Sequence, residues 1–395
     1  MNVTPLAVHS VRGVRDALQA HGWDAERSHG AAEGAGWAAF HLTGLDAPAL
    51  EALVHTGGRL GLEVVTGDGW ALLAGSRSRL SAFARPWTVP EPLREAAMQV
   101  GLALPPNPPP VGWRTGQGTL PLDQPVIVGI LNVTPDSFSD GGTHRDVAAA
   151  VAHAEQMLAD GAAVIDVGGE STRPGRERTV AGADEVARVI PVVQALVRAV
   201  PGIVISVDTM KASVARAAVE AGAAVVNDVT AFRHDPRMAA TVVETGAGVI
   251  LMHSRGAALE LAALHHADYG NDVVGTVLNE MRASLLEALA AGVPADTIVL
   301  DPGLGFAKTA EQNLVLSDQL SVLLALGRPL MVGPSRKRFL GAVTGRDVGE
   351  RDVATAAACA LGWERGARLF RVHDVAGAHD ALALAHAVGG TAPYR

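Results

Sequence analysis

The chain reads Gly129-Ile-Leu-Asn-Val-Thr-Pro-Asp-Ser-Phe-Ser-Asp-Gly-Gly142 at the point where a run of apolar residues ends. Small polar residues, one proline and a Gly-Gly pair follow the apolar residues 126–131, which is typical of a buried strand that leads into a shaped, exposed loop. Oxygen ligands and hydrogen-bond donors therefore gather where the strand stops. Taken alone, the loop is equally well explained as an ordinary polar turn, so its meaning depends on the rest of the chain.

The same change from apolar strand to polar loop recurs along the rest of the chain. Strand-like apolar runs occur at 126–131, 162–167, 203–207, 224–229, 248–252, 297–300, 329–332 and 368–372. Helix-like segments follow them at 145–160, 183–200, 211–222, 236–245, 272–291, 309–326, 351–366 and 377–388. Several of these helices begin at an acidic or hydroxyl residue and end at a glycine, which are the usual helix start and stop signals.

Eight strand–helix units in this length predict an α/β fold, a (β/α)8 TIM barrel. The alternative is a doubly wound open sheet, which usually carries a Gly-rich dinucleotide-binding turn after its first strand. No such turn follows residue 131. In a barrel the carboxyl ends of all eight strands converge on one face, and active sites are built there.

A proline-rich stretch, Pro105-Pro106-Asn107-Pro108-Pro109-Pro110, marks the clearest domain boundary. We predict a linker at 105–112, a small α+β N-terminal domain at 1–104 and the barrel at 113–395. The N-terminal domain offers no His, Cys or carboxylate constellation, so we expect it to be dispensable for chemistry. Its expected elements are strands at 37–42, 62–66 and 70–74 and a helix at 47–60 capped by Asp46, and a short hairpin is expected at 115–122 before the barrel.

Composition excludes several classes of function. Apolar residues make up 48% of the chain and charged residues 18%, which favours a buried core over disorder. A net charge of −9 without a long basic run disfavours a nucleic-acid partner. The single cysteine, Cys359, allows no internal disulfide and fits a reducing compartment. Since neither a signal-peptide pattern nor a membrane-length apolar run is present, we predict a cytoplasmic protein that does not engage a membrane.

Nearly all of the unusual polar residues lie just after the predicted strands. In chain order these ends carry Asn132, Asp166-Val-Gly-Gly-Glu-Ser-Thr-Arg-Pro-Gly175, Ser206-Val-Asp208-Thr, Asn227-Asp228, Met252-His253-Ser254, Asp301-Pro-Gly-Leu-Gly-Phe-Ala-Lys308, Gly333-Pro-Ser-Arg-Lys-Arg338 and Arg371-Val-His373-Asp374. One Asp in such a place is most simply a helix cap. Eight polar ends in succession are not explained by capping, and they predict a site.

The predicted site mixes acceptors with cations. Carboxylate and amide groups of Asp208, Asn227 and Asp301 suit a flat heterocycle rich in hydrogen-bond donors. The cations suit an anion such as phosphate, and they are Arg173, Lys337, Arg371 and His373. Asn132 supplies a neutral oxygen of the kind that Mg²⁺ accepts beside waters and phosphate oxygens. No His/Cys spacing suggests zinc, and His265-His266 is expected to be solvated. The residues alone predict a barrel enzyme that handles a heterocycle with a phosphate-type leaving group and uses no activated nucleophile.

Five motifs together resemble the dihydropteroate synthases, the sulfonamide targets of folate biosynthesis. They are Asn132-Val-Thr-Pro-Asp-Ser-Phe-Ser-Asp-Gly-Gly142, Glu170-Ser-Thr-Arg-Pro-Gly175, Asp301-Pro-Gly, Ser335-Arg-Lys337 and Arg371-Val-His373, and they occur in the order found in that family. The resemblance covers roughly 120–390. It implies the condensation of 6-hydroxymethyl-7,8-dihydropterin diphosphate with 4-aminobenzoate, which gives 7,8-dihydropteroate and diphosphate.

The resemblance also implies roles for individual residues. Pterin binding is implied for Asp208, Asn227, Asp301 and Lys337. Diphosphate binding is implied for Asn132, Thr172, Arg173, Arg371 and His373, with Asn132 also facing the cofactor Mg²⁺. Binding of 4-aminobenzoate is implied for Phe138, Thr172, Pro174, Phe306 and Arg338. The catalytic residues would be Asp136, Lys337 and Arg371, with Asp136 stabilising a transient pterin cation, and the enzyme would be a homodimer.

The chain departs from the family pattern at two places. Ala307 stands where the family often has Gly, and Arg338 follows the Ser-Arg-Lys motif where many members have Ser. Arg338 therefore either pairs with the carboxylate of 4-aminobenzoate or points to solvent. Two other functions stay open: a pterin-dependent methyltransferase, which needs no diphosphate site, and a non-catalytic pterin-binding paralogue or scaffold, which the extra N-terminal domain suggests.

Overall fold

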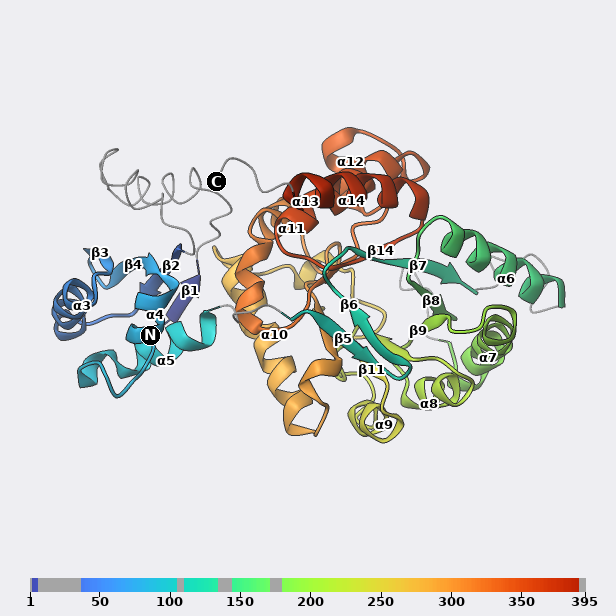
Figure 1. The fold of residues 1–395 in the computed structure, drawn as a ribbon, viewed down its shortest axis with the longest axis horizontal. Helices are drawn as coiled ribbons and strands as arrows, with labels where there is room; N and C mark the ends of the chain where they lie inside the picture. The colour runs from blue at the N-terminus through green and yellow to red at the C-terminus, as the bar shows by residue number, and fades with distance from the viewer. Residues whose placement is uncertain (1, 6–36, 105–109, 134–143, 171–179, 391–395) are drawn as a thin grey trace. The chain divides into compact units, whose positions relative to one another are not determined.

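The computed structural model describes residues 2–5, 37–104, 110–133, 144–170 and 180–390. The chain forms two compact units (Figure 1). One comprises Met1–Pro109 together with Asp318–Gly327, and the other comprises Pro110–Ser317 and Arg328–Arg395. The segment 318–327 is thus grouped with the N-terminal residues although it is encoded between two strands of the barrel.

The N-terminal unit is a small α+β fold, as predicted. The four strands among its described residues form an antiparallel sheet in the order β1-β2-β4-β3. They are β1 (Asn2–Pro5), β2 (Trp37–Thr43), β3 (Glu63–Gly67) and β4 (Trp70–Ser76). The helices within residues 37–104 are α3 (Ala47–Leu60), α4 (Arg77–Phe83), η1 (Glu91–Leu93) and α5 (Arg94–Ala103). Asp46 caps α3 as expected, because its carboxylate accepts the Ala49 N–H at 2.9 Å.

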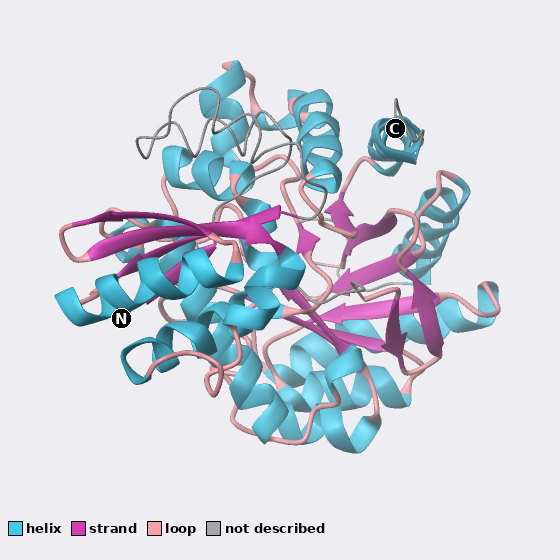
Figure 2. Ribbon diagram, turned by 60° about the vertical axis from the view of Figure 1, so that its left-hand side comes forward, coloured by secondary structure: helices cyan, strands magenta, loops and turns pink. Residues whose placement is uncertain are grey.

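The second unit confirms the TIM barrel. Its eight strands are all parallel, in the order β12-β11-β10-β9-β8-β7-β14-β13, and helices surround them (Figures 1 and 2). A parallel bridge from Leu300 to Leu330 joins the two ends of this order, so the sheet is nearly closed. The strands are β7 (Val126–Asn132), β8 (Val164–Gly168), β9 (Val204–Asp208), β10 (Val225–Asp228), β11 (Gly248–Met252), β12 (Ile298–Asp301), β13 (Met331–Val332) and β14 (Leu369–Val372).

The helices follow the predicted order with two differences. They are α6 (His144–Ala159), α7 (Gly182–Ala199), α8 (Ala212–Glu220), α9 (Met238–Thr245), α10 (Val273–Ala290), α11 (Ala310–Asp318), α12 (Arg338–Thr344), α13 (Asp352–Glu364) and α14 (Val375–Gly390), with η2 (Leu264–His266), η3 (Ala295–Thr297), η4 (Leu320–Leu326) and η5 (Val348–Glu350). Helix α12 was not expected. The helix predicted at 309–326 was wrong in its second half, where buried Leu320, Leu323 and Leu326 repeat every three residues, as a 3₁₀ helix requires. Among the described residues, no helix is both long and apolar enough to cross a bilayer.

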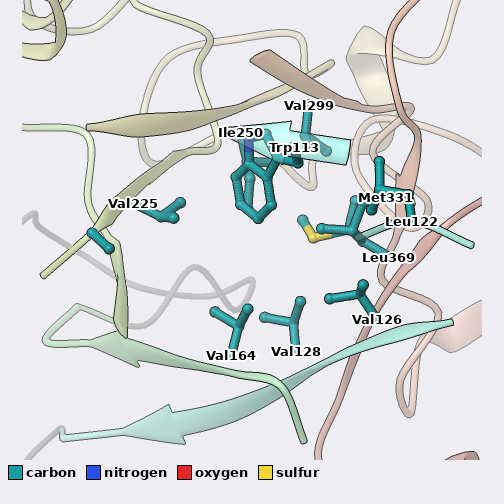
Figure 3. Packing of buried hydrophobic residues seen from close by; sticks show 11 residues of the cluster. Trp113, Leu122, Val126, Val128, Val164, Val225, Ile250, Val299, Met331 and Leu369 are labelled. Atoms are coloured by element: carbon teal, nitrogen blue, oxygen red, sulfur yellow. The ribbon is translucent and has the colours of Figure 1, made fainter. Parts of the chain in front are cut away.

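A hairpin closes the end of the barrel that lies opposite the strand C-termini. It is formed by β5 (Gly112–Thr115) and β6 (Gly118–Pro121), so its turn lies where we predicted it but its first strand begins before the predicted range 115–122. Trp113 is fully buried in a cluster that includes the first residues of three strands, Val126, Val164 and Val225 (Figure 3). Its indole N–H donates to the Thr297 carbonyl at 2.8 Å. Because this end is filled with apolar side chains, polar chemistry is left to the other end.

Candidate active site

A cavity of about 620 Å³ opens at the carboxyl ends of the strands. Polar side chains at or after the ends of β7, β8, β9, β13 and β14 line it, in agreement with the site predicted from the sequence. Its described lining includes Asn132 after β7, Asp208 at the end of β9, Phe306 after β12, Ser335, Lys337 and Arg338 after β13, and Arg371 and His373 on and after β14. A second cavity of about 50 Å³ shares Asp208, Phe306, Lys337 and Arg371 with the first and adds Asn227 and Asp301.

Two buried carboxylates hold Arg371 in the barrel mouth. Its Nε donates to Asp166 Oδ2 at 2.6 Å, and its Nη2 donates to Asp208 Oδ2 at 2.7 Å. Burial acts to lower the pKa of Arg371, but the two carboxylates outweigh burial and raise it. Burial raises the pKa of Asp208 to about 7. The charge of Arg371 opposes this rise, and the charge of Asp166 adds to it. The guanidinium is therefore fixed in direction and permanently charged.

Acceptor atoms gather in the smaller cavity. Asn227 donates its amide to Asp166 Oδ2 at 3.0 Å, which leaves Asn227 Oδ1 and Asp166 Oδ1 as buried acceptors with no hydrogen-bond partner in the described residues. Asp301 accepts the Gly303 N–H at 2.7 Å through Oδ1. Burial raises the pKa of Asp301 to about 6 against the lowering effects of that bond and of Lys337. Unsatisfied buried acceptors at a strand end indicate a ligand that brings donors.

The turn after β13 places Lys337 between these acceptors and the larger cavity. Arg336 precedes it with a φ of 55°, an uncommon value for a non-glycine residue. Its guanidinium forms two parallel bonds with Asp352 at 2.7 and 2.8 Å, which hold the turn in that shape. The Lys337 ammonium then lies 3.8 Å from the centre of the Phe306 ring. Burial and Arg371 lower the pKa of Lys337 to about 8, so the group remains mostly charged at neutral pH.

A buried lysine supports the turn between Asp301 and Phe306. Lys308 donates to the carbonyls of Gly303 and Phe306 at 3.1 Å each. Ala307, the residue that replaces the family's frequent Gly, is fully buried with a φ of 45°. This left-handed conformation is the physical reason for glycine at that position, because a side chain there is strained.

The remaining rim residues suit an anion and a hard cation. Ser335 Oγ accepts the backbone N–H of His373 at 3.1 Å and lies 2.9 Å from its Nδ1, so the hydroxyl can donate to Nδ1 and leave the ring proton on Nε2. A Cβ atom built on Gly168 would lie 3.8 Å from both Asn132 Oδ1 and Asp208 Oδ2. The glycine thus leaves free a space that two oxygen atoms face, and oxygen donors are the ligands Mg²⁺ prefers.

The described part of the chain brings most of the predicted site residues together. Asn132, Asp208, Asn227, Asp301, Phe306, Lys337, Arg338, Arg371 and His373 line the two cavities. Arg338 is exposed at the rim and donates to the Ala262 carbonyl at 3.1 Å. Five predicted residues lie outside the described residues: Asp136, Phe138, Thr172, Arg173 and Pro174.

Sequence reasoning assigned no role to Asp166, Lys308 or His253. Asp166 is fully buried and connects Arg371 to Asn227. It lies inside β8, in register with Ser206 of β9 and two residues before the strand ends at Gly168, so the rule that polar residues follow the strands did not single it out. Lys308 and His253 come into contact only in the folded chain, and no spacing in the sequence predicts this contact.

A parallel eight-stranded barrel with a polar mouth of buried carboxylates and fixed cations defines an enzyme of the (β/α)8 class that binds a polar, anionic substrate. Comparison with known proteins narrows this class. Residues 128–373 match the family described as pterin binding enzyme. A dihydropteroate synthase of Bacillus subtilis is 44% identical over 253 residues, which are 64% of this chain and 85% of that protein. One from Mycobacterium leprae is 47% identical over 262 residues, 65% of this chain and 90% of the other.

Solved structures agree with these relatives. A Xanthomonas albilineans dihydropteroate synthase with 4-aminobenzoic acid superposes with a TM-score of 0.66 at 42% identity, covering 72% of this chain and 99% of that one. The same enzyme in complex with 7,8-dihydropteroate gives a TM-score of 0.63 at 40% identity, covering 71% and 99%. The chain therefore belongs to the pterin-binding enzyme family and, within it, to the dihydropteroate synthases.

Proposed function

We propose that the chain condenses 6-hydroxymethyl-7,8-dihydropterin diphosphate with 4-aminobenzoate in folate biosynthesis, giving 7,8-dihydropteroate and diphosphate. The observation that carries this proposal is the division of one site into two parts. The inner recess is lined by the unpaired Oδ1 of Asn227 and by the carboxylates of Asp208 and Asp301, and fixed cations lie at its edge, on Lys337 and Arg371. A pterin diphosphate has the same division, with a donor-rich ring at one end and an anion at the other.

We assign the pterin ring to the recess of about 50 Å³ and its surroundings. Asp301 and Asp208 accept from the ring N–H and amino groups, and Asn227 can offer Oδ1 to a further donor. Lys337 contacts the ring from the side that Phe306 closes. Since both carboxylates have raised pKa values without substrate, donors from the ring favour their ionised forms on binding.

Arg371 and His373 are assigned to the diphosphate, with Thr172 and Arg173 as further ligands implied by the family. Asn132 would hold Mg²⁺, which supplies charge neutralisation for the departing diphosphate when bound. The facing oxygens of Asn132 and Asp208 around Gly168 support this assignment. Phe306 and Arg338, with Phe138, Thr172 and Pro174, are proposed to bind 4-aminobenzoate near the outer end of the larger cavity.

The reaction breaks the bond between the pterin methylene carbon and the diphosphate oxygen, whose electron pair leaves with the diphosphate. The amine nitrogen of 4-aminobenzoate then forms the new bond to that carbon and loses one proton to water. An aromatic amine needs no strong base for this step, so no activated nucleophile of the protein is proposed to take part. Arg371 stabilises charge on the leaving group, and Asp136 is proposed to stabilise the transient pterin cation.

Two other functions are disfavoured by the same geometry. A pterin-dependent methyltransferase has no use for the fixed cations at the rim, and a scaffold has no reason to retain buried acceptors without partners.

One assay separates the three functions: purified protein with Mg²⁺, pterin diphosphate and labelled 4-aminobenzoate. Labelled dihydropteroate whose formation a sulfonamide blocks is the expected product. Arg371→Met should abolish it while Arg216→Met, which removes an exposed pair with Glu244, should not. Pterin binding without product in the wild type would overturn the proposal.

We further infer a homodimer that acts in the cytoplasm. Exposed apolar side chains on α13 and α14 support self-association, among them Val353, Leu361, Leu384 and Val388. The buried, unpaired Cys359 is compatible with a reducing compartment. Light scattering on the purified chain tests the dimer, and aspartate at Val353 and Leu384 should yield monomers.

The N-terminal unit is proposed to be dispensable for chemistry. A shortened chain should begin at Pro110, because the Leu122 N–H donates to the Val111 carbonyl at 3.0 Å and Gly112 pairs with Pro121. We expect this chain to keep the kcat/KM of the full protein. A folded product without activity would show that the N-terminal unit takes part in catalysis.

A further inference from the structure

We propose that the loop between β11 and α10 binds a divalent transition-metal ion of the zinc class through Glu260, His265 and His266. One ligand atom from each residue can be chosen so that all three lie within 4.8 Å of one another. His266 Nε2 lies 3.1 Å from Glu260 Oε2, and His265 Nε2 lies 3.8 Å from Glu260 Oε1. Neighbouring ligands of tetrahedral zinc, with bonds of about 2.0–2.1 Å, lie roughly 3.3 Å apart. One of the two measured distances is slightly shorter than this separation, and the other is slightly longer.

The ligand types favour zinc or a related ion over Mg²⁺. Two imidazoles and one carboxylate are a set that zinc, cobalt and nickel accept, whereas Mg²⁺ prefers oxygen ligands alone. Three protein ligands leave a fourth position for water. The site is therefore chemically different from the oxygen-lined space beside Asn132, and the same metal is not expected in both places.

The loop holds the three residues in place by its own backbone. The Ala263 N–H donates to the Glu260 carbonyl at 2.8 Å, and the short helix η2 continues from Leu264 to His266. The two imidazole rings lie side by side, with centroids 4.1 Å apart and planes at 47°. The His266 ring also packs over Gly256, where a Cβ atom would approach it to 2.5 Å. A rotamer of His266 that faces Glu260 is thus already selected.

An ordinary surface ion pair accounts less well for this arrangement. Exposed pairs contribute little to stability, so they give little reason for two imidazoles and one carboxylate to converge. A metal ion accounts for the convergence, because it binds both imidazoles and the carboxylate at once. Sequence analysis did not predict the site, since Glu260 lies five positions before the His-His pair and outside any common zinc spacing.

Metal binding here would stiffen one wall of the larger cavity. Ala262 lines that cavity, and its carbonyl accepts from Arg338 at 3.1 Å. Arg255 Nη1 donates to the His266 carbonyl at 3.3 Å from the other side. An ion held by Glu260 and His266 would therefore fix the ends of the short segment that contains Ala262.

The test uses the full chain after treatment with a chelator, and the probe is the metal alone. Titration with Co²⁺ should produce the visible absorption of a tetrahedral complex, and calorimetry with Zn²⁺ should show one binding event that Mg²⁺ does not displace. Glu260→Gln and His266→Gln should each weaken Zn²⁺ binding by ~10-fold or more. His379→Gln, which changes another exposed histidine beside a carboxylate, should leave it unchanged.

Circular dichroism of each variant excludes loss of folding as the cause, and all the altered side chains are largely solvent-exposed or at the surface. Two results would overturn the proposal. One is the absence of tetrahedral Co²⁺ absorption in the wild type. The other is equal Zn²⁺ affinity in the wild type and in a chain that carries glutamine at 260, 265 and 266 together. Neither result bears on dihydropteroate formation, so the inference and the proposed function fail independently.

Discussion

The Lys308 ammonium lies 3.0 Å from Nδ1 of His253, although both groups are basic and buried. The contact is consistent because the imidazole is neutral. Burial and Lys308 lower the pKa of His253 to about 4, and its Nε2 lies 2.8 Å from Glu280 Oε2. Burial opposes ionisation of Glu280, yet His253 and Arg255 lower its pKa to about 2. The ring proton therefore sits on Nε2, and Nδ1 accepts from Lys308.

Replacing Lys308 by Met should loosen the turn that carries Asp301 and Phe306. Three acceptors would lose their donor: Nδ1 of His253 and the carbonyls of Gly303 and Phe306. Since each unsatisfied buried group costs ~1–3 kcal/mol, we expect several kcal/mol less stability in urea unfolding. We also expect the KM for pterin diphosphate to rise more than the KM for 4-aminobenzoate. Equal changes in both values would argue against a role in positioning Asp301.

Binding of the pterin should weaken in acid because Asp301 must be ionised to accept from the ring. The pKa of this carboxyl is about 6, so the KM for pterin diphosphate should rise by ~10-fold for each pH unit below 6. Asp301→Asn should bind poorly at every pH and show a shallower slope, because Asp208, with a pKa of about 7, still has to ionise. An unchanged slope in the variant would assign the titration to another group.

Acid should weaken pterin binding, but it should favour the folded state of the free protein through the same carboxyl, Asp301. The folded pKa of Asp301 lies above its ordinary value of 3.8, so its contribution to stability is fully present below that pH and is lost as pH rises through 6. The thermal midpoint of Asp301→Asn should therefore gain on that of the wild type as the pH rises from about 4 to about 6, between the ordinary and the folded pKa. The lowered pKa of Lys337 has the opposite effect on stability, and that effect falls above pH 8.

Asp166→Asn should reduce activity although Asp166 lies behind the groups assigned to substrate. Its Oδ2 accepts from both Arg371 and Asn227, and hydrogen bonds to a charged group contribute ~1.5–3 kcal/mol. We expect kcat/KM to fall by ~10–100-fold, and calorimetry should show weaker binding of the unphosphorylated pterin as well. Asp160→Asn, at an exposed acid bonded to Gln156, is the matched control. Unchanged pterin binding in Asp166→Asn would contradict the link to Asn227.

Trp113→Ala should destabilise the barrel without changing its chemistry. The indole is fully buried at the end remote from the cavities, and truncation of a core Trp costs ~3–5 kcal/mol. The urea midpoint should fall, while the KM values at low denaturant stay the same. Trp87→Ala, which removes an 81% exposed indole, should change neither. Altered KM values in folded Trp113→Ala would mean that the apolar cluster around Trp113 also influences the shape of the active-site cavity.

The sequence predicted the barrel well because its signal is local. Each strand is a short apolar run with polar residues at its end or soon after it, as in β7, which ends at Asn132, and β9, which ends at Asp208. The same rule located the cavity, since all parallel strands end on one face. The failure at η4 had a different cause: an apolar segment rich in Leu satisfies helical periodicity at either three or 3.6 residues per turn.

Side-chain pairings across the barrel were harder to predict. Lys308 and His253 are 55 residues apart, and Arg371 and Asp166 are 205 apart. Nothing in composition or spacing says which acid will face which cation, because that choice depends on the direction of each side chain within the closed sheet. At Ala307 the sequence shows a departure from the family pattern but not its effect. The effect becomes clear from the φ of 45° in the structure, a left-handed value that favours glycine.

The double restraint on Arg371 has a consequence for the way an anion can bind. Two carboxylates already hold two of its N–H groups, and only the remaining N–H groups are available to a ligand. An anion that contacts them also lies near Asp208, and negative charge on Asp208 opposes the attraction of the guanidinium. Binding of an anion in this mouth should therefore depend on Lys337, which lines the same cavity, as well as on Arg371.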